Sequence, residues 1–117
     1  LPCNADKNPQ FDLILLGLGP DGHTASLFPD TSALNEHQEL CTAVYVKKFE
    51  SWRITITFPV INAAREILLL SEGEGKADIV RELLIDKKDA FTYPVQFIKP
   101  KGNMHWYIDR AAAKNVT

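Results

Sequence analysis

The sequence predicts an α/β domain whose core is a mostly parallel β-sheet with flanking helices. Two apolar runs, residues 11–16 and 66–70, have the continuous hydrophobic character of buried parallel strands, and each is followed by a glycine-containing turn. After the second turn, apolar residues recur at helical spacing over residues 74–85. Strands that alternate with helices form parallel sheets, because the intervening helix returns the chain to the starting edge of the sheet.

The composition fits an ordinary single domain of 117 residues. Hydrophobic residues make up 45% and charged residues 24% of the chain, which excludes a collagen, a coiled coil and a disordered tail. Lys and Arg total 13 against 15 Asp and Glu, so no basic excess is present to bind a nucleic-acid backbone. No apolar run approaches the roughly 20 residues of a membrane span, and no signal segment leads the chain. We therefore expect a cytoplasmic protein that binds neither nucleic acid nor membranes.

The two cysteines, Cys3 and Cys41, stand far apart and show no metal-ligand spacing. Reduced thiols in a reducing compartment are the simpler interpretation, and a single disulfide in a secreted protein is the alternative. His37 and His105 also lack any pattern of partner ligands. We therefore expect no metal site in this chain.

The first part of the chain predicts an N-terminal loop, a strand and a short helix. Residues 1–10 are polar and contain two prolines, as expected of a loop. The strand over residues 11–16 is apolar apart from Asp12 and continuously so over 13–16, which indicates that both of its faces are covered. A short helix is expected around residues 24–28, because Pro29 stops any longer one. Residues 30–41 are polar and predict a loop.

The middle of the chain predicts three strands and a second short helix. Residues 41–46 form a modest strand, whereas residues 53–58 alternate and are β-branched, which makes them the clearest strand by period. A short helix is expected over residues 59–64, because Pro59 has the fixed φ that suits a first helical turn. Residues 66–70 then give the second strand of buried type.

The longest predicted helix covers residues 74–85, where Ala77, Val80 and Leu84 recur at helical spacing. The elements expected after it are a polar loop at 86–94, short strands at 95–98 and 104–108, and a helical turn at 110–115. A parallel sheet needs helices on both faces, and this chain offers one long helix. The chain is therefore either a minimal fold or part of a larger one.

Gly17, Gly19 and Gly22 match the spacing GxGxxG directly after the first predicted strand. The spacing is one feature of dinucleotide-binding folds, but Pro20 and Pro29 leave little room for the long helix that should bind the pyrophosphate. No second strand ends in an acidic residue placed to bind a ribose. We therefore interpret the glycines as a loop that lets some ligand approach the backbone closely.

Asp21 and His23 lie two residues apart at the carboxyl end of the first strand, the edge where open α/β sheets bind ligands. A histidine exchanges a proton near neutral pH, and a neighbouring carboxylate can orient its ring and stabilise the charged form. The pair is therefore a candidate for general acid–base catalysis. The alternative, which the residues alone leave open, is that Asp21 caps the following turn and His23 makes a local hydrogen bond.

Two cations are candidates for binding an anionic ligand. Lys76 follows Gly73 and Gly75 in the first turn of the predicted helix, where a cation opposes the helix dipole and a bound anion would relieve that conflict. The segment lacks the Walker spacing, and Ala77 stands where a nucleotide loop needs Ser or Thr. Arg53 opens a predicted strand and points either at the ligand edge or at solvent. For Lys76 too an alternative remains, namely that its side chain is simply exposed to solvent on the helix surface.

The longest motif of the chain is residues 16–29, which read LGLGPDGHTASLFP. Two later segments follow it in order, RITITFPVINAAREILLLSEGEGKADIVRELL and WYIDRAAA. Together these segments resemble the 6-phosphogluconolactonases of the glucosamine-6-phosphate isomerase/6-phosphogluconolactonase family. The resemblance covers nearly the whole chain from Phe11 onward, and it implies a Rossmann-like sheet.

The resemblance implies hydrolysis of 6-phospho-D-glucono-1,5-lactone to 6-phosphogluconate in the oxidative pentose phosphate pathway, with no cofactor. Carried over by motif, His23 would activate the attacking water and protonate the ring oxygen as it leaves. Asp21 would orient His23. The residues that the resemblance implies in substrate and phosphate binding are Gly19, Gly22, Arg53 and Lys76.

The sequence departs from the family at two points. Glucosamine-6-phosphate deaminases share the Asp-Gly-His motif but carry a glutamate five residues after the histidine, where this chain has Phe28. That difference favours the lactonase branch. Lactonase domains are also much longer, and the Gly-Gly-Ser phosphate loop of their N-terminal half has no counterpart here. We therefore expect this chain to be the C-terminal half of a larger domain.

Three functional hypotheses follow from these residues. The first is a lactonase, the second is a glucosamine-6-phosphate deaminase or isomerase, and the third is a non-catalytic module or inactive fragment of the same fold. Half of a doubly wound sheet leaves an unpaired strand edge and uncovered apolar faces. We therefore expect the isolated chain to be weakly active, and to bind a complementary N-terminal segment or associate with itself.

Overall fold

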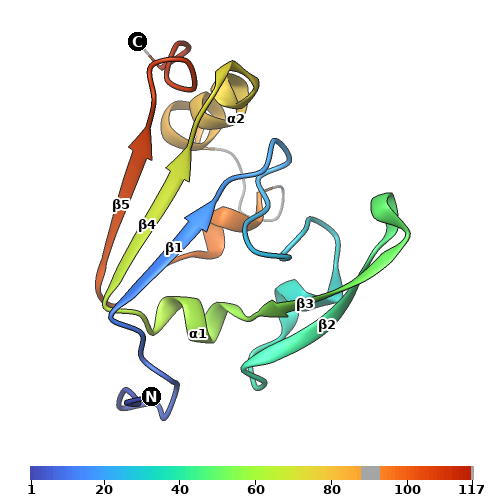
Figure 1. Ribbon diagram of the computed structural model, residues 1–117, viewed down its shortest axis with the longest axis vertical. Coiled ribbons are helices and arrows are strands. Elements are labelled where there is room, and N and C mark those ends of the chain that lie inside the picture. The colour runs from blue at the N-terminus through green and yellow to red at the C-terminus, as the bar shows by residue number, and fades with distance from the viewer. Residues whose placement is uncertain (88–92, 117) are drawn as a thin grey trace.

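The computed structural model describes residues 1–87 and 93–116 of the chain, and a parallel sheet lies at its centre (Figure 1). The strands of this sheet, in spatial order, are β1 (Leu13–Gly17), β4 (Glu66–Ser71) and β5 (Asn103–Ile108). An antiparallel hairpin of β2 (Cys41–Val46) and β3 (Ser51–Ile56) extends to one side. The predicted α/β class with a mostly parallel sheet is therefore confirmed, and the hairpin forms a second, separate sheet.

Parallel pairing brings the carboxyl ends of the strands to a common edge of the central sheet. Leu15 of β1 lies opposite Leu68 of β4, and β5 continues the sheet in the same direction. The loop after β1 carries Asp21 and His23, and the turn after β4 carries Lys76. The topology thus places these candidate residues at the same edge, although two of them are distant from the third in sequence.

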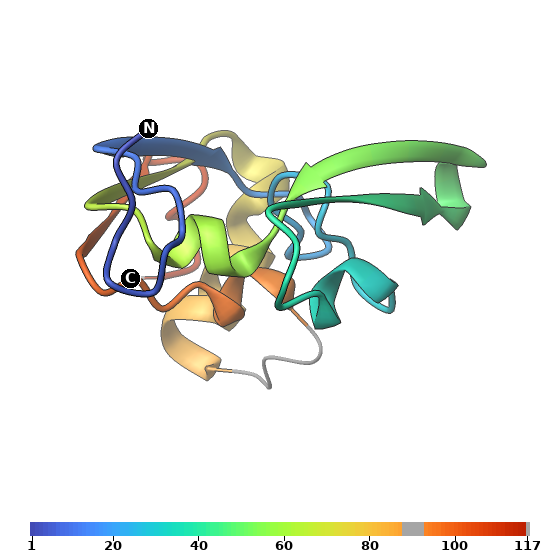
Figure 2. The same cartoon turned by 90° about the horizontal axis from the view of Figure 1, so that it is seen from below.

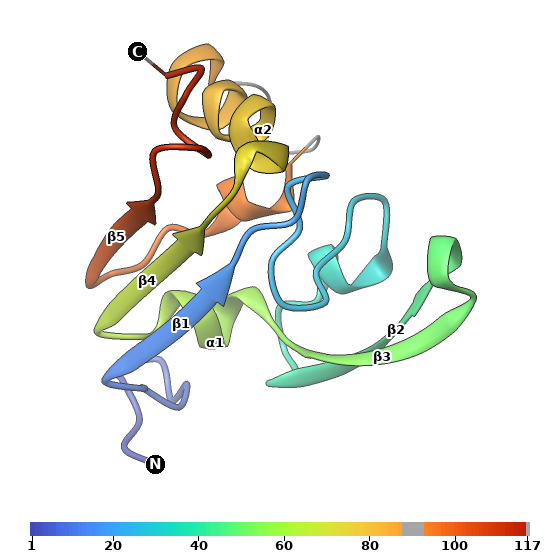
Figure 3. The same ribbon diagram turned by 45° about the horizontal axis from the view of Figure 1, so that its top comes forward.

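The helices of the described chain pack toward one face of the central sheet (Figures 2 and 3). Their bounds are α1 (Phe58–Asn62), the 3₁₀ turn η3 (Glu74–Lys76), α2 (Ala77–Arg81), the π-helical turn η4 (Glu82–Asp86) and the 3₁₀ turn η5 (Pro94–Phe97). The three segments η3, α2 and η4 follow one another and form the helix that was predicted at 74–85. Proline occupies the first turn of both α1 and η5, where its missing N–H costs no hydrogen bond.

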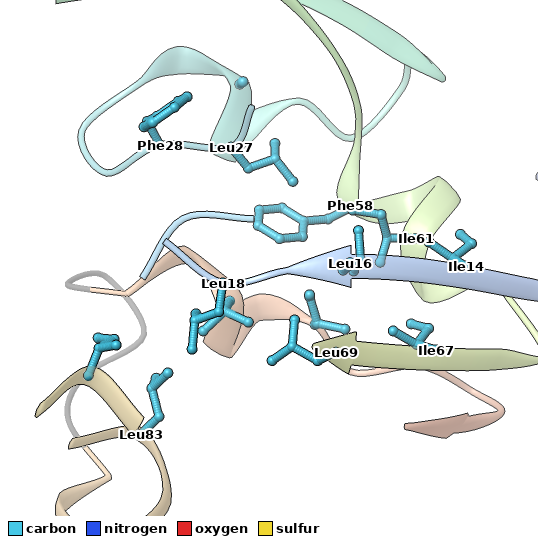
Figure 4. Packing of buried hydrophobic residues seen from close by; sticks show 14 of the residues in the cluster. Ile14, Leu16, Leu18, Leu27, Phe28, Phe58, Ile61, Ile67, Leu69 and Leu83 are labelled. Carbon is cyan, nitrogen blue, oxygen red and sulfur yellow. The ribbon is translucent and has the colours of Figure 1, made fainter. Parts of the chain in front are cut away.

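The hydrophobic core lies between this covered face and the helices (Figure 4). Ile67 and Leu69 of β4 have no exposed surface. They pack in one cluster with side chains from β1, α1 and the helix after β4, namely Ile14, Leu16, Phe58, Ile61, Val80 and Leu83. Full burial of each such aliphatic side chain contributes about 1.5–3 kcal/mol, so this layer supplies the main stabilisation of the chain.

The opposite face of the central sheet is open. Leu13 and Leu15 of β1 are 49% and 59% exposed, and Leu70 of β4 and Tyr107 of β5 are 46% and 59% exposed. Side chains alternate across a strand, so the residues beside the buried ones necessarily point to this second face. The expectation that both faces of the first strand are covered was therefore wrong for this chain.

Several predicted elements differ from the observed ones. Residues 24–28 form a tight turn rather than a helix, with a bridge between Thr24 and Leu27 and a left-handed φ of 50° at Ala25. The strand predicted at 95–98 is the turn η5, because buried β-branched residues fit a 3₁₀ turn that begins at Pro94 as well as a strand.

The remaining differences concern bounds. β3 begins and ends two residues before the predicted 53–58, and α1 is shorter than the predicted 59–64. Residues 110–115 form a series of turns in place of a regular helix. Of the loop predicted at 86–94, residues 88–92 lie outside the described residues. Residues 1–10 form a loop, as expected.

Leu69 and Leu70 offer a direct test of the two faces, because they are neighbours in β4 with opposite orientations. We expect Leu69→Ala to lower the free energy of unfolding by about 2–5 kcal/mol, since it leaves a cavity in the core. We expect Leu70→Ala to cost less than about 1 kcal/mol, since its side chain is already half exposed. Urea denaturation of both variants measures this difference, and equal losses would show that the second face is covered in solution.

Candidate active site

The loop after β1 is closed by its own backbone hydrogen bonds. The amide of Gly22 donates to the carbonyl of Gly19 at 3.0 Å, and the amide of Gly19 donates to the carbonyl of His23 at 2.8 Å. The amide of Val95 donates to the carbonyl of Gly22 at 3.0 Å and ties the loop to η5. These bonds fix the position from which the side chains of Asp21 and His23 leave the backbone.

Positions 19 and 22 need glycine, because a side chain at either position would clash with a neighbouring ring of the site. A Cβ atom on Gly19 would lie 2.0 Å from Nδ1 of His23, so the imidazole rests directly on the glycine backbone. Gly22 has a φ of +78° and faces the ring of Tyr93, which a Cβ atom would approach to 2.6 Å. Substrate binding by these two glycines stays a prediction, and the structure gives them a role in seating the catalytic candidates.

Asp21 and His23 form a hydrogen-bonded pair. Nδ1 of His23 lies 2.5 Å from Oδ1 of Asp21, and the backbone amide of His23 donates to the same oxygen at 3.1 Å. The imidazole also stacks on the ring of Phe28, with 4.1 Å between centroids. The two residues that the sequence singled out therefore act as one unit, with the ring held from both sides.

The protonation of the pair follows from the environment of Asp21. Partial burial raises the pKa of this carboxyl, but hydrogen bonds from Lys48 and His23 outweigh that effect and lower the pKa to about 2. An ionised carboxylate only accepts hydrogen bonds, so Nδ1 of His23 carries the proton that joins the two side chains. Nε2 is then the nitrogen that can accept a proton from a substrate or a water molecule.

His23 and Lys76 line a common cavity of about 330 Å³ at the carboxyl edge of the central sheet. The other lining residues are Gly17, Leu18, Gly19, Pro20, Thr24 and Ala25. Nζ of Lys76 donates to the carbonyl of Leu18 at 2.5 Å, which holds the ammonium group beside the loop after β1. The structure thus brings the predicted base and one predicted phosphate ligand together.

Arg53 lies on the hairpin and is not among the residues that line this cavity. Its guanidinium carbon lies 5.5 Å from the ring centroid of Phe49, and Phe49 meets Phe28 edge-on at 5.7 Å. Arg53 is exposed and makes no ion pair with any residue that the structure describes. Two aromatic rings, Phe49 and Phe28, therefore lie between Arg53 and His23.

Two contributors to the site were missed by sequence reasoning. Nζ of Lys48 lies 2.9 Å from Oδ2 of Asp21, although Lys48 is 27 residues away and in a segment without a motif. The buried Oγ1 of Thr24 also lines the cavity, and it has no hydrogen-bond partner among the described residues. Thr24 stands beside His23 in the motif and could have been noted, whereas nothing in the sequence marks Lys48.

Within residues 1–87 and 93–116, no three His, Cys, Asp or Glu side chains converge in a way that could hold a metal ion. Cys3 and Cys41 are both free and exposed. None of the described helices has the length and apolar character that a membrane crossing requires.

Comparison with known proteins gives one consistent result. The family model described as glucosamine-6-phosphate isomerases/6-phosphogluconolactonase matches residues 2–106. A 6-phosphogluconolactonase of Bos taurus is 42% identical over 114 residues, covering 96% of this chain and 44% of the bovine protein. One of Synechocystis is 44% identical over 108 residues, covering 92% of this chain and 44% of the relative.

Solved structures agree with the sequence relatives. The crystal structure of 6-phosphogluconolactonase from Leishmania guyanensis matches all of this chain with a TM-score of 0.84 and 30% identity, and the match covers 48% of that structure. The chain therefore spans about half the length of the proteins that it resembles. The expected Rossmann-like fold and the match to half of a larger domain are both confirmed.

Gly19 is the position at which a single methyl group should disturb the site. We expect Gly19→Ala to displace the His23 ring from Asp21 and to lower the free energy of unfolding by about 1–3 kcal/mol. Gly17→Ala is the matched control, because a Cβ atom there meets no atom within 4 Å. Imidazole ¹⁵N chemical shifts and urea denaturation report the two effects, and an undisturbed His23 signal in Gly19→Ala would contradict the geometry.

Proposed function

Because this chain belongs to the glucosamine-6-phosphate isomerase/6-phosphogluconolactonase family, we propose that it supplies the catalytic half of a 6-phosphogluconolactonase. The enzyme would hydrolyse 6-phospho-D-glucono-1,5-lactone to 6-phosphogluconate. The observation that carries the proposal is the pair of Asp21 and His23, in which Nδ1 is held by the carboxylate while His23 lines a cavity shared with Lys76. The identity of about 40% with named lactonases supports the same reaction.

The proposed hydrolysis uses His23 twice. Nε2 takes a proton from a water molecule while the water oxygen forms a bond to the lactone carbonyl carbon. The tetrahedral intermediate then collapses, the bond from that carbon to the ring oxygen breaks, and His23 returns the proton to the leaving oxygen. The carboxylate of Asp21 stabilises the imidazolium between these two steps, because it lies against Nδ1 throughout.

The cations near the pair are the proposed ligands of the substrate phosphate. Lys76 lines the cavity with His23, so its ammonium group can hold a phosphate within reach of the base. Arg53 is a second proposed ligand, because it is exposed on the adjacent hairpin and has no carboxylate partner among the described residues. Gly19 and Gly22 contribute by keeping the loop close to the sugar.

The second candidate function is the deaminase or isomerase reaction on glucosamine 6-phosphate. Its relay would need a carboxylate where Phe28 stands, but the Phe28 ring stacks on His23 and cannot transfer a proton. This contact favours the lactonase. The two activities are separated by assaying lactone hydrolysis and ammonia release from glucosamine 6-phosphate with the same preparation.

We further propose that the working enzyme contains a polypeptide segment that covers the open face of the central sheet. Leu13, Leu15, Leu70 and Tyr107 form an apolar face whose side chains are 46–59% exposed, whereas Ile67 and Leu69 on the covered face have no exposed surface. The relatives contain more than twice the matched length, so they have enough chain to supply such a segment. The exposed free thiols of Cys3 and Cys41 fit a reducing compartment, and we propose the cytoplasm.

The catalytic role of His23 is tested in the longer enzyme that contains this chain. We expect His23→Ala to lower kcat by about 10²–10⁴-fold with little change in KM, because general acid–base catalysis acts on the transition state. His37→Ala is the control, since His37 is exposed on a loop outside the motif and does not line the cavity with His23. A pH-stat assay corrected for spontaneous hydrolysis measures both, and unchanged turnover in His23→Ala would remove the assignment.

The open face is tested with residues 1–117 alone. We expect this chain to associate with itself and to hydrolyse the lactone weakly, because an apolar face and an unpaired strand edge are exposed. Light scattering gives the size and a pH-stat gives the activity. A monodisperse monomer with turnover far above spontaneous hydrolysis would show instead that the chain is a self-sufficient lactonase.

A further inference from the structure

We propose that Lys48 is a positioning residue that holds Asp21 in place and sets the pH at which His23 takes up a proton. The consequence for catalysis rests on the proposed role of His23 as the base. The coupling between the three side chains does not depend on that role, because it concerns only how they interact with one another.

Lys48 reaches the pair from a different part of the fold. It lies in the 3₁₀ turn η2 (Lys47–Phe49), at the tip of the hairpin between β2 and β3. Its Nζ donates to Oδ2 of Asp21 at 2.9 Å, while Oδ1 of the same carboxylate accepts from His23. Each oxygen of Asp21 therefore has its own partner, and the carboxylate cannot rotate without losing one of them.

One aromatic ring contacts both Lys48 and His23. Nζ of Lys48 lies 5.1 Å from the ring centroid of Phe28 and 5.0 Å from that of Phe49. Phe28 stacks on the imidazole of His23, so the cation and the proposed base contact one ring. These contacts place the ammonium group over the carboxylate, where an exposed lysine would otherwise sample many rotamers.

The exposure of these groups argues against a purely structural role. The side chain of Lys48 is 48% exposed and that of Asp21 is 29% exposed. Ion pairs of this kind contribute little to the free energy of folding, because water screens the charges and both side chains lose freedom. The main effect of Lys48 is therefore on the charge and orientation of Asp21, and through Asp21 on His23.

The direction of the effect follows from the charges around the imidazole. The negative charge of Asp21, on the loop after β1, stabilises the protonated imidazole of His23. The positive charge of Lys48, on the hairpin, offsets part of the charge of Asp21 and so weakens this stabilisation. The other cations nearby, Lys76 after β4 and Arg53 on β3, remain when Lys48 is removed. When a neutral side chain replaces Lys48, the negative charge of Asp21 is no longer offset by the ammonium group. His23 should then be protonated at higher pH.

The test is an NMR titration of the histidine rings in the longer enzyme that contains this chain. We expect Lys48→Met, which keeps an apolar stem against the two rings, to raise the titration midpoint of His23 by about half to one pH unit. The other two histidines of this chain, His37 and His105, should titrate as in the parent, which also shows that the variant is folded. An unchanged or lowered His23 midpoint overturns the proposal.

Two matched variants separate charge from other effects. Lys48→Arg should restore the parent midpoint of His23, because it keeps a cation at the hairpin tip. Lys47→Met removes the neighbouring charge, which has no carboxylate partner among the described residues, and should leave the midpoint unchanged. If Lys47→Met shifts the His23 midpoint as much as Lys48→Met does, the overall positive charge of the hairpin controls the midpoint. That result would overturn the specific role of Lys48.

The same variant also has a kinetic readout in the longer enzyme, namely the pH profile of kcat/KM. We expect Lys48→Met to move the acidic limb of the kcat/KM profile to higher pH by the same amount, with KM nearly constant. A raised KM with an unmoved limb would assign Lys48 to substrate binding and overturn the proposal. If His23 proves not to be the base, the limb fails to follow the NMR midpoint, while the measured coupling of Lys48, Asp21 and His23 still stands.

Discussion

The imidazole of His23 lies directly on the backbone of Gly19, and the geometry of the site depends on this contact. The loop after β1 folds back so tightly that the amide of Gly19 bonds to the carbonyl of the same histidine. Only a residue without a side chain permits this approach. With the ring seated there, Nδ1 meets the carboxylate of Asp21 and Nε2 remains for proton transfer.

The site is assembled from three segments with different physical anchors. The loop after β1 is fixed by its backbone bonds and by the core residues of the strand before it. The segment after β4 delivers Lys76 because parallel strands end at one edge of the sheet. The hairpin brings Lys48 to Asp21 through contacts with Phe28 and Phe49, and Phe28 in turn stacks on His23, so Phe28 links the hairpin to the catalytic pair.

The two faces of the central sheet differ, and this difference fits a chain that carries the candidate site but spans about half the length of its relatives. One face has a packed core that includes Ile67 and Leu69, and side chains of β1, β4 and β5 pack in or against it. The other face presents leucines to solvent. The candidate catalytic pair stands on the loop that follows β1, a strand with one covered and one open face.

Local sequence patterns were enough to predict the strands of the central sheet, the helix after β4 and the candidate pair of Asp21 and His23. These features follow from local patterns, namely apolar runs, helical spacing and a motif only a few residues long. The turn at η5 was mistaken for a strand, because burial alone does not distinguish a 3₁₀ turn from a short strand in an apolar segment. Only the tertiary structure decided which face of the sheet is covered and that Lys48 reaches Asp21. Both depend on how segments distant in sequence pack together, and no local pattern of residues specifies such contacts.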